Sequence, residues 1–439
     1  MKISLKDFEY GFTVFALMIY LGGIVLLVLS GGANESDVAV NYSTAPLQII
    51  YLFIYFITIL LIASRWKKNI FVFRKNRFIW LLLIVAVISV FWSFSPGDTK
   101  KETFKLICSS LFGVYLATRY TLKQQVQILG VTFGLAVILS FLFAVGLPKY
   151  GIMGGVHAGK WRGIFMHKNG LGSNMVLSCI VFLNLAMSAK KKAWIYWCGC
   201  GLSILLILLA ASTASLVNLV ILIAIFFILR ALWLPYQLMI PTITGIFSAG
   251  LTFLFWFKEN QDLIFGALGK DSNLSGRGDL WSLVYDMIWK EPWLGYGYGG
   301  FWQGWNGESA YIWFAEPWTP THPHSGFLAL WLDLGLLGLS IFWIAFVISS
   351  IRSLLIVRLY RTEEYLFPAI MMTYIILVNL AETSLFDGNK TWIMYISFSC
   401  STVITLNEHK NKKITKSITN TEFSYLMGGE KNANHHARS

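Results

Sequence analysis

The chain has 439 residues, of which 56% are hydrophobic and only 13% are charged. In soluble globular proteins about a quarter of all residues are charged, so this composition excludes that class. Apolar runs of about 20 residues recur, which is the length that crosses the hydrocarbon core of a bilayer. The net charge of +13 does not indicate a nucleic-acid partner, because membrane proteins collect Lys and Arg in their cytoplasmic segments. We therefore expect an all-α, multi-pass membrane protein.

Hydropathy predicts about twelve membrane spans. If both termini are cytoplasmic, the inside segments hold 23 of the 35 Lys and Arg residues, and this excess favours that orientation. The first span has no small-residue cleavage site after it, so we interpret it as retained. The predicted spans lie near residues 10–30, 46–63, 78–95, 103–118, 126–148, 169–188, 194–212, 215–234, 237–257, 325–349, 365–385 and 391–406.

This pattern divides the chain into four parts. Residues 1–257 hold spans one to nine, and residues 325–406 hold the last three. Residues 258–324 form a large periplasmic loop between them. Residues 407–439 are polar, basic and poor in apolar side chains, so we expect a disordered cytoplasmic tail.

The loop after the fifth span concentrates cations ahead of a helix. It includes Arg162, Lys168 and Asn169 within the stretch 160–170. Such cations suit an anionic phosphate, because a helix N-terminus adds its free amides and positive dipole. Arg162 is the strongest candidate, since a guanidinium can fork two phosphate oxygens. The alternative is interfacial anchoring, with Asn169 as the helix N-cap.

The large loop contains one predicted amphipathic helix, over residues 279–290. The flexible residues 275 and 276 precede it and Pro292 follows it. We expect this helix to lie across the outer mouth of the bundle. Its apolar residues at helical spacing are Leu280, Val284, Met287 and Ile288.

Three further features of this loop have more than one interpretation. Arg277 stands between two glycines, which would let the backbone approach a ligand closely, although a surface salt bridge is an alternative. Trp289 and Trp293 are as typical of an interfacial belt as of a sugar-binding surface. The glycine-rich stretch 295–300 resembles a phosphate-binding loop only superficially, because no strand precedes it.

Two histidines, His322 and His324, come just before the tenth span. The unperturbed pKa of imidazole is closest to neutrality, so we predict that His324 is a general base. Pro323 separates His322 from the span, which favours His324 over it. We expect no metal site, because residues at i and i+2 do not share a helix face and no third ligand is evident. A structural histidine that caps the span is the alternative.

Acidic residues inside spans are functional candidates by default. Asp333 lies within the tenth span and Glu382 near the outer end of the eleventh. We favour Glu382, and the alternative is that either residue pairs with a cation such as Lys105. Glu382, together with His322 and Asn169, is predicted to lie around the catalytic residue and to position it.

Several motifs together resemble the O-antigen ligase/polymerase superfamily. The resemblance covers roughly residues 90 to 385 in order and spacing and includes the glutamate of the penultimate span. The motifs are WSFSP at 92–96, RGIFMHKNGLG at 162–172, SGRGDLW at 275–281, EPWLGYGYGGF at 291–301 and HPHSGFLALWLDLGLLG at 322–338.

This resemblance implies a fold and an activity. Members of the superfamily are inner-membrane glycosyltransferases with a GT-C-like helical bundle. They move a glycan from undecaprenyl diphosphate to an acceptor on the periplasmic side, without a nucleotide sugar, a cofactor or an essential metal. By this resemblance Arg162 and Arg277 hold the diphosphate and His324 activates the acceptor. Where the family often has Asn after this histidine, the chain has Ser325.

The reaction and its partners follow from the same reasoning. A single displacement would invert the anomeric centre, because no carboxylate pair is placed to form a covalent intermediate. The implied partners are an undecaprenyl-diphosphate-linked oligosaccharide, a glycan or lipid A-core acceptor, membrane lipid and a chain-length regulator. The His-Lys-Asn variant at 167–169 is more similar to the exopolysaccharide polymerase branch, and an O-antigen ligase is the alternative. A flippase or transporter is disfavoured, because the sequence has no internal repeat.

Overall fold

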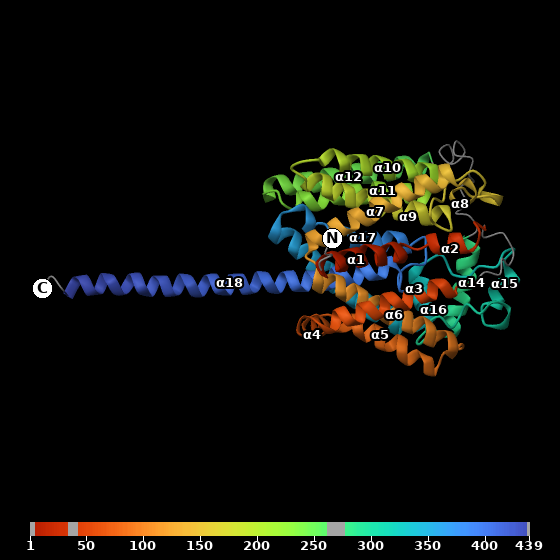
Figure 1. The fold of residues 1–439 in the computed structure, drawn as a ribbon, viewed down its shortest axis with the longest axis horizontal. Coiled ribbons are helices and arrows are strands. Elements are labelled where there is room, and N and C mark those ends of the chain that lie inside the picture. Colours follow the sequence, from red (N-terminus) through yellow and green to blue (C-terminus); the bar gives the residue numbers. More distant parts are fainter. Residues whose placement is uncertain (1–4, 34–42, 261–276, 437–439) are drawn as a thin grey trace.

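A computed structural model describes residues 5–33, 43–260 and 277–436 of the chain. The described residues form helices joined by turns and loops, with one isolated antiparallel bridge between Ile152 and Trp161 as their only β-type pairing. The long helices run along a common axis and form one bundle (Figure 1). The predicted all-α class is confirmed.

The helices follow one another along the chain with short connections. They are α1 (Leu5–Leu21), α2 (Ile24–Leu29), α3 (Ala45–Ala63), α4 (Trp66–Lys75), α5 (Arg77–Ile88), α6 (Pro96–Arg119), α7 (Leu122–Gly146), α8 (Pro148–Gly151), α9 (Lys168–Ser188), α10 (Ala193–Ala210), α11 (Thr213–Ala231), α12 (Tyr236–Glu259), α14 (Arg277–Lys290), α15 (Ala310–Ala315), α16 (Gly326–Tyr360), α17 (Phe367–Asn379) and α18 (Lys390–His436). Single 3₁₀ turns lie at Ser89–Phe91, Gly155–His157, Gly304–Asn306 and Glu363–Tyr365.

Among the described residues, six helices are long and apolar enough to cross a membrane by themselves: α3, α7, α9, α10, α11 and α16. The chain is therefore a multi-pass membrane protein. Each of the predicted spans overlaps a helix, but shorter or more polar ones such as α6 and α17 do not meet this criterion. The number of spans that cross the bilayer stays a prediction.

The two ends of the bundle differ. One end, which we call the tail end, carries α4 and the helical extension of α18 beyond the bundle (Figure 1). The opposite end, the loop end, carries α8, α14 and α15 (Figure 1). The predicted orientation would place the tail end in the cytoplasm.

Helix α14 confirms the amphipathic helix predicted in the large loop. All four of its predicted apolar residues are buried, at 0 or 1% exposure. They pack against Tyr296, Phe301 and the first turns of α16. Trp289 and Trp293 remain exposed, which both an interfacial belt and a sugar-binding surface require.

The glycine-rich stretch 295–300 packs against the turn between α5 and α6. The Tyr298 amide donates to Ser89 Oγ at 3.0 Å, and the Phe94 amide donates to the Tyr296 carbonyl at 3.0 Å. A Cβ added at Gly297, where φ is +85°, would lie 2.4 Å from Ser93 Cβ. These glycines therefore allow close packing of two motifs that are far apart in the sequence.

Helix α16 is broken at Gly335, where the sequence predicts one continuous span. The backbone there has φ +63° and ψ −166°. The carbonyls of Pro292 and Trp293 accept the amides of Leu336 and Leu337 at 2.8 and 3.2 Å. Residues of the large loop thus replace helical hydrogen bonds at this break.

The predicted disordered tail differs from the structure, in which α18 continues as one helix to His436. The apolar first half of α18 supplies the folded turns from which a helix can propagate. No proline follows Pro368, so the polar continuation meets no strong helix breaker.

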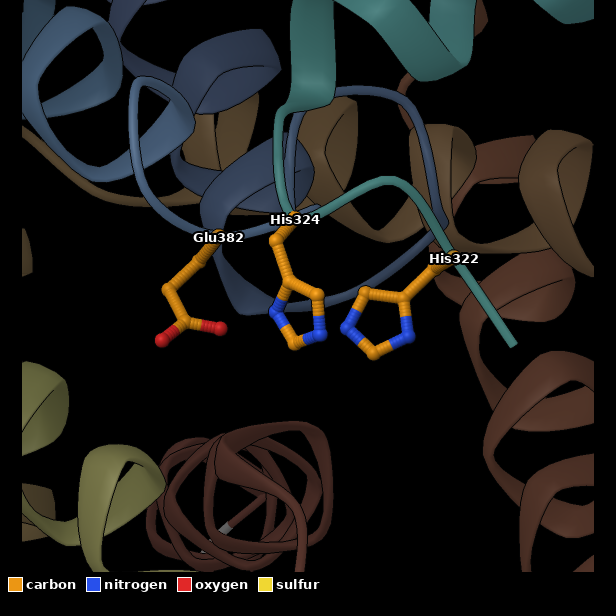
Figure 2. A group of neighbouring side chains, drawn as sticks. All are labelled: His322, His324 and Glu382. Atoms are coloured by element: carbon orange, nitrogen blue, oxygen red, sulfur yellow. The ribbon is translucent and has the colours of Figure 1, made fainter. Parts of the chain in front are cut away.

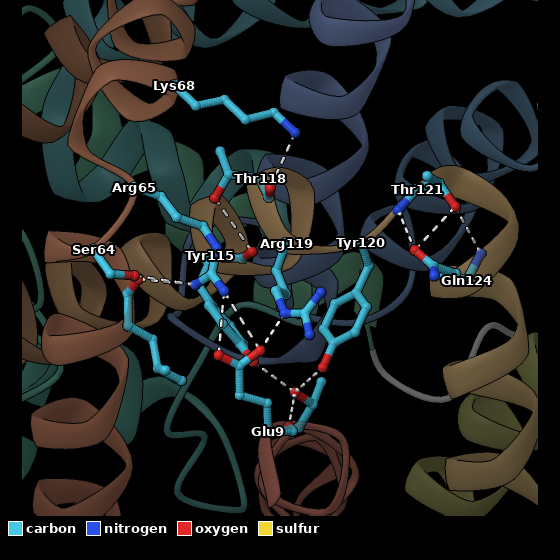
Figure 3. Close-up of polar contacts among 12 residues, drawn as sticks. Glu9, Ser64, Arg65, Lys68, Tyr115, Thr118, Arg119, Tyr120, Thr121 and Gln124 are labelled. Atoms are coloured by element: carbon cyan, nitrogen blue, oxygen red, sulfur yellow. Dashed lines mark hydrogen bonds and ion pairs between the residues drawn. The ribbon is translucent and has the colours of Figure 1, made fainter. Parts of the chain in front are cut away.

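At the tail end, a buried carboxylate joins three parts of the chain (Figure 3). Glu9 of α1 pairs with Arg65, which precedes α4, at 3.2 Å and also with Arg119 of α6. Thr13, one turn after Glu9, lies 3.0 Å from the hydroxyls of both Tyr115 and Tyr120. We call Glu9, Arg65 and Arg119 the Glu9 cluster.

Candidate functional site

The loop end brings together three titratable side chains that are distant in sequence. His322 and His324 precede α16, and Glu382 follows α17. One ligand-type atom from each lies within 4.8 Å of the other two, and all three residues are half-buried. Figure 2 shows the side chains pointing the same way from their loops, with His324 between the other two. We call these residues the His–Glu cluster.

The backbone at His324 is held where α16 meets the end of α17. His324 has φ +51°, a left-handed conformation that His adopts more readily than most side chains. The next residue, Ser325, is buried and donates to the Asn379 carbonyl at 3.3 Å. A Cβ at Gly326 would lie 2.1 Å from Asn379 Oδ1, which accepts the Ser384 amide at 2.9 Å. Asn379 therefore joins the two loops that carry the cluster.

His322 is also held in the cluster. Its ring centroid is 4.2 Å from that of His324, and Thr321 Oγ1 lies 3.1 Å from His322 Nδ1. Trp281 of α14 donates its indole N–H to the Pro323 carbonyl at 2.9 Å. Although Pro323 separates His322 from the span in sequence, α14 thus supplies a tertiary contact that holds this segment.

The geometry also bears on metal binding. The sequence shows no third ligand beside the two histidines, whereas the structure places Glu382 within reach of both. Two imidazoles and a carboxylate form a ligand set that suits Zn²⁺. The geometric reason for excluding a metal is therefore removed, and metal independence stays a prediction.

Arg162 lies in a different environment from the one predicted. It is fully buried, and its guanidinium already donates to backbone carbonyls that hold the loop before α9 to the end of α2. A phosphate could reach this side chain only by displacing those carbonyls. The acceptors, at 2.6 to 3.5 Å, belong to Gly32, Ala33, Lys149, Tyr150 and Met166.

The N-terminus of α9 is capped by His167, and not by Asn169 as the alternative interpretation expected. His167 Nδ1 accepts the Asn169 amide at 3.2 Å, which requires the neutral imidazole. Burial, together with the nearby His157, Lys168 and Arg162, lowers the pKa of His167 to about 4. Lys168 and Asn169 follow it in the first turn of α9 and are half-buried.

One contact joins this helix start to the element that leads to Glu382. Tyr374 of α17 donates to the Ser173 carbonyl of α9 at 3.3 Å. The first turns of α9 and the last turns of α17 therefore lie next to each other. Arg277 begins α14 at the same end of the bundle, and its side chain lies outside the described residues. Asn379 is the supporting residue that sequence reasoning missed, because it has no motif around it.

The comparisons with known proteins fall on the same segments. A family model described as O-antigen ligase matches residues 198–343, which include both cluster histidines. The exopolysaccharide production protein ExoQ of Rhizobium meliloti (strain 1021) is 24% identical over 307 residues, covering 68% of this chain and 70% of that protein. The chain is therefore similar to the O-antigen ligase/polymerase superfamily in sequence, as its motifs suggested.

This similarity supports a coarse function for this membrane protein, which is a ligase- or polymerase-like role in polysaccharide biosynthesis. The break at Gly335 and the two histidines all lie inside the matched segment. Arg162 and Glu382 lie outside it, so their roles depend on the geometry described above.

Proposed function

We propose that this membrane protein is an inner-membrane glycosyltransferase that polymerises undecaprenyl-diphosphate-linked repeat units on the periplasmic side. The observation that carries the proposal is the His–Glu cluster at the loop end, where residues from two loops converge. The similarity to an exopolysaccharide production protein favours polymerisation.

In the proposed reaction, His324 removes the proton of the acceptor hydroxyl as its oxygen attacks the anomeric carbon. The bond from that carbon to the diphosphate oxygen breaks, and the diphosphate leaves with the electron pair. Glu382 stabilises the imidazolium that forms, because a carboxylate next to a protonated imidazole favours the charged form. A single displacement of this kind inverts the anomeric centre and uses no cofactor.

The leaving diphosphate needs positive charge close to its oxygens. We assign that role to Arg277 and Lys168, which lie at the starts of α14 and α9. Arg162 contributes indirectly in this proposal, because it holds the loop that precedes Lys168. Arg277→Lys should then stay inactive, since the planar fork is lost while the charge remains.

The orientation can be tested separately. Alkaline phosphatase fused at about residue 300 should be active, and the same enzyme fused after residue 410 should be inactive, because of the Lys and Arg distribution. The reverse pattern would place the His–Glu cluster in the cytoplasm and would contradict the proposal.

The second candidate is an O-antigen ligase, which the description of the matching family favours. Proteoliposomes that contain the purified chain and a lipid-linked repeat unit decide between the two. A polymerase should give a ladder of longer lipid-linked glycans without further components. A ligase should give product only after lipid A-core is added.

A further inference from the structure

A cationic cavity lies at the tail end, away from the His–Glu cluster. Its volume is about 280 Å³, and it lies between the α4–α5 junction and α16. Three cations from the junction, Arg74, Lys75 and Arg77, line it together with Arg352 of α16. The predicted orientation places this cavity at the cytoplasmic face of the bilayer.

The local structure explains how four cations come together. Asn76 ends α4 and precedes α5, and its buried amide donates to the Val72 carbonyl at 3.2 Å. Arg352 donates to Asn76 Oδ1 at 2.8 Å and to the Lys75 carbonyl at 3.0 Å. Arg352 is thereby fixed against the junction, while the side chains of Arg74, Lys75 and Arg77 are exposed around it.

No protein carboxylate neutralises these charges within the described residues. The ion pairs found there lie elsewhere, and the cavity lining contains no acidic residue. A larger cavity of about 590 Å³ at the same end differs, because Glu363 and Glu364 accompany its cations. Four like charges around a small space repel one another, so an anion there would be stabilised.

The inner wall of the same cavity is apolar. Phe78 and Ile348 line it, and α5 and α16 pack side by side beneath it. Further along these helices, Leu81, Ile84 and Val347 are large apolar side chains that remain exposed. A ligand that fills the cavity and covers this surface needs an anionic head and an apolar tail.

We infer that this cavity binds an anionic phospholipid of the cytoplasmic leaflet. Its phosphodiester lies among Arg74, Lys75, Arg77 and Arg352, and its acyl chains lie along α5 and α16. Basic pockets between membrane helices on this side are suited to such head groups. The inference does not depend on the glycosyl transfer proposed above.

The test uses the full-length chain purified in mild detergent and native mass spectrometry with phosphatidylglycerol or phosphatidylethanolamine of matched acyl chains. Wild type should retain phosphatidylglycerol preferentially. The double variant Arg74→Gln/Arg77→Gln should bind phosphatidylglycerol about 25-fold more weakly, because each lost charge should weaken the binding about fivefold. The matched control Lys67→Gln/Lys410→Gln removes the same charge from exposed tail-end residues outside the cavity and should change binding little.

Equal binding by the cavity variant and the control would overturn the inference, as would equal retention of the two lipids by wild type. Displacement of phosphatidylglycerol by excess inorganic phosphate would also overturn it, because the site would then recognise a free phosphate and not a lipid. A melting temperature of the cavity variant close to that of the control would show that the loss comes from the site and not from unfolding.

Discussion

The two ends of the bundle each combine one carboxylate with two basic side chains, but the chemistry differs. In the Glu9 cluster both partners are arginines, which stay protonated, and Glu9 is buried at 5% exposure. Burial alone would raise the pKa of Glu9, but hydrogen bonds and charges from Arg119 and Arg65 hold it below its usual value. In the His–Glu cluster the partners are imidazoles, and all three side chains are half-buried.

This difference separates a structural cluster from the one that we propose to be catalytic. Permanent charges paired around the buried Glu9 join α1 to the starts and ends of neighbouring helices, and they offer no proton to exchange. A neutral imidazole, unlike a guanidinium, can accept a proton, and half-burial leaves the two histidines accessible to an acceptor. Substitutions in the two clusters should therefore act on different quantities, which are activity at the loop end and stability at the tail end.

The largest expected effect is on activity at His324. His324→Ala should lower polymer formation by about 10² to 10⁴, the usual contribution of a positioned base, while the protein still inserts at normal levels. Polymer ladders in proteoliposomes, normalised to inserted protein, measure it. His409→Ala at the tail end is the control. Retained activity of the His324 variant would show that His324 is not the general base.

Glu382→Gln should have a smaller effect on the same reaction. The amide keeps the shape but cannot stabilise an imidazolium, so turnover should fall by about 10- to 100-fold with little change in KM for the donor. Initial rates over a range of lipid-linked donor concentrations separate the two parameters. An increase in KM alone would instead assign Glu382 to substrate binding.

Glu9→Gln should act on stability. Removal of the carboxylate leaves Arg65 and Arg119 close together without their partner, which should cost about 1 to 3 kcal/mol after allowance for their partial exposure. Thermal unfolding in detergent measures this change. Asp98→Asn, which removes a carboxylate from an exposed pair with Lys101, should cost less than about 0.5 kcal/mol. Normal stability of the Glu9 variant would contradict the structural role.

His167 should make the stability of the protein depend on pH, and this effect should be smaller than that of Glu9→Gln. Its pKa is about 4 in the folded protein against 6.5 for a free imidazole, so the unfolded chain binds this proton more readily. Stability should therefore fall as the pH drops from about 6.5 toward 4. His167→Asn keeps an N-cap and should make this fall shallower in melting curves. An unchanged slope would show that His167 is protonated in the folded state.

EDTA treatment distinguishes a base from a metal site at the His–Glu cluster, and its expected effect on activity is the smallest. If His324 acts as a base, polymer formation should persist after EDTA treatment, and His322→Ala should cost much less than His324→Ala. Loss of activity in EDTA, together with equal losses at both histidines, would assign the His–Glu cluster to a metal.

Some of these features were predictable because they depend on short-range patterns. The helical spacing of Leu280, Val284 and Met287 predicts α14 without any tertiary information, since residues three and four apart share a helix face. Apolar runs likewise predict the spans, because the hydrocarbon thickness sets their length. The motif around His324 was sufficient to single out that residue as a candidate base, and together with the other motifs it suggested the superfamily.

Only the tertiary structure decided which partners these residues have. Glu382 joins His324 because Asn379 holds the end of α17 against the start of α16, and no local pattern encodes a contact between two such loops. Arg162 donates to carbonyls near residue 32, whose closeness depends on how α2 packs against the loop before α9. The break at Gly335 likewise needs Trp293 from another segment. Sequence by itself determined the helices and the candidate side chains, because periodicity and residue chemistry are local, whereas packing of distant loops determined their neighbours.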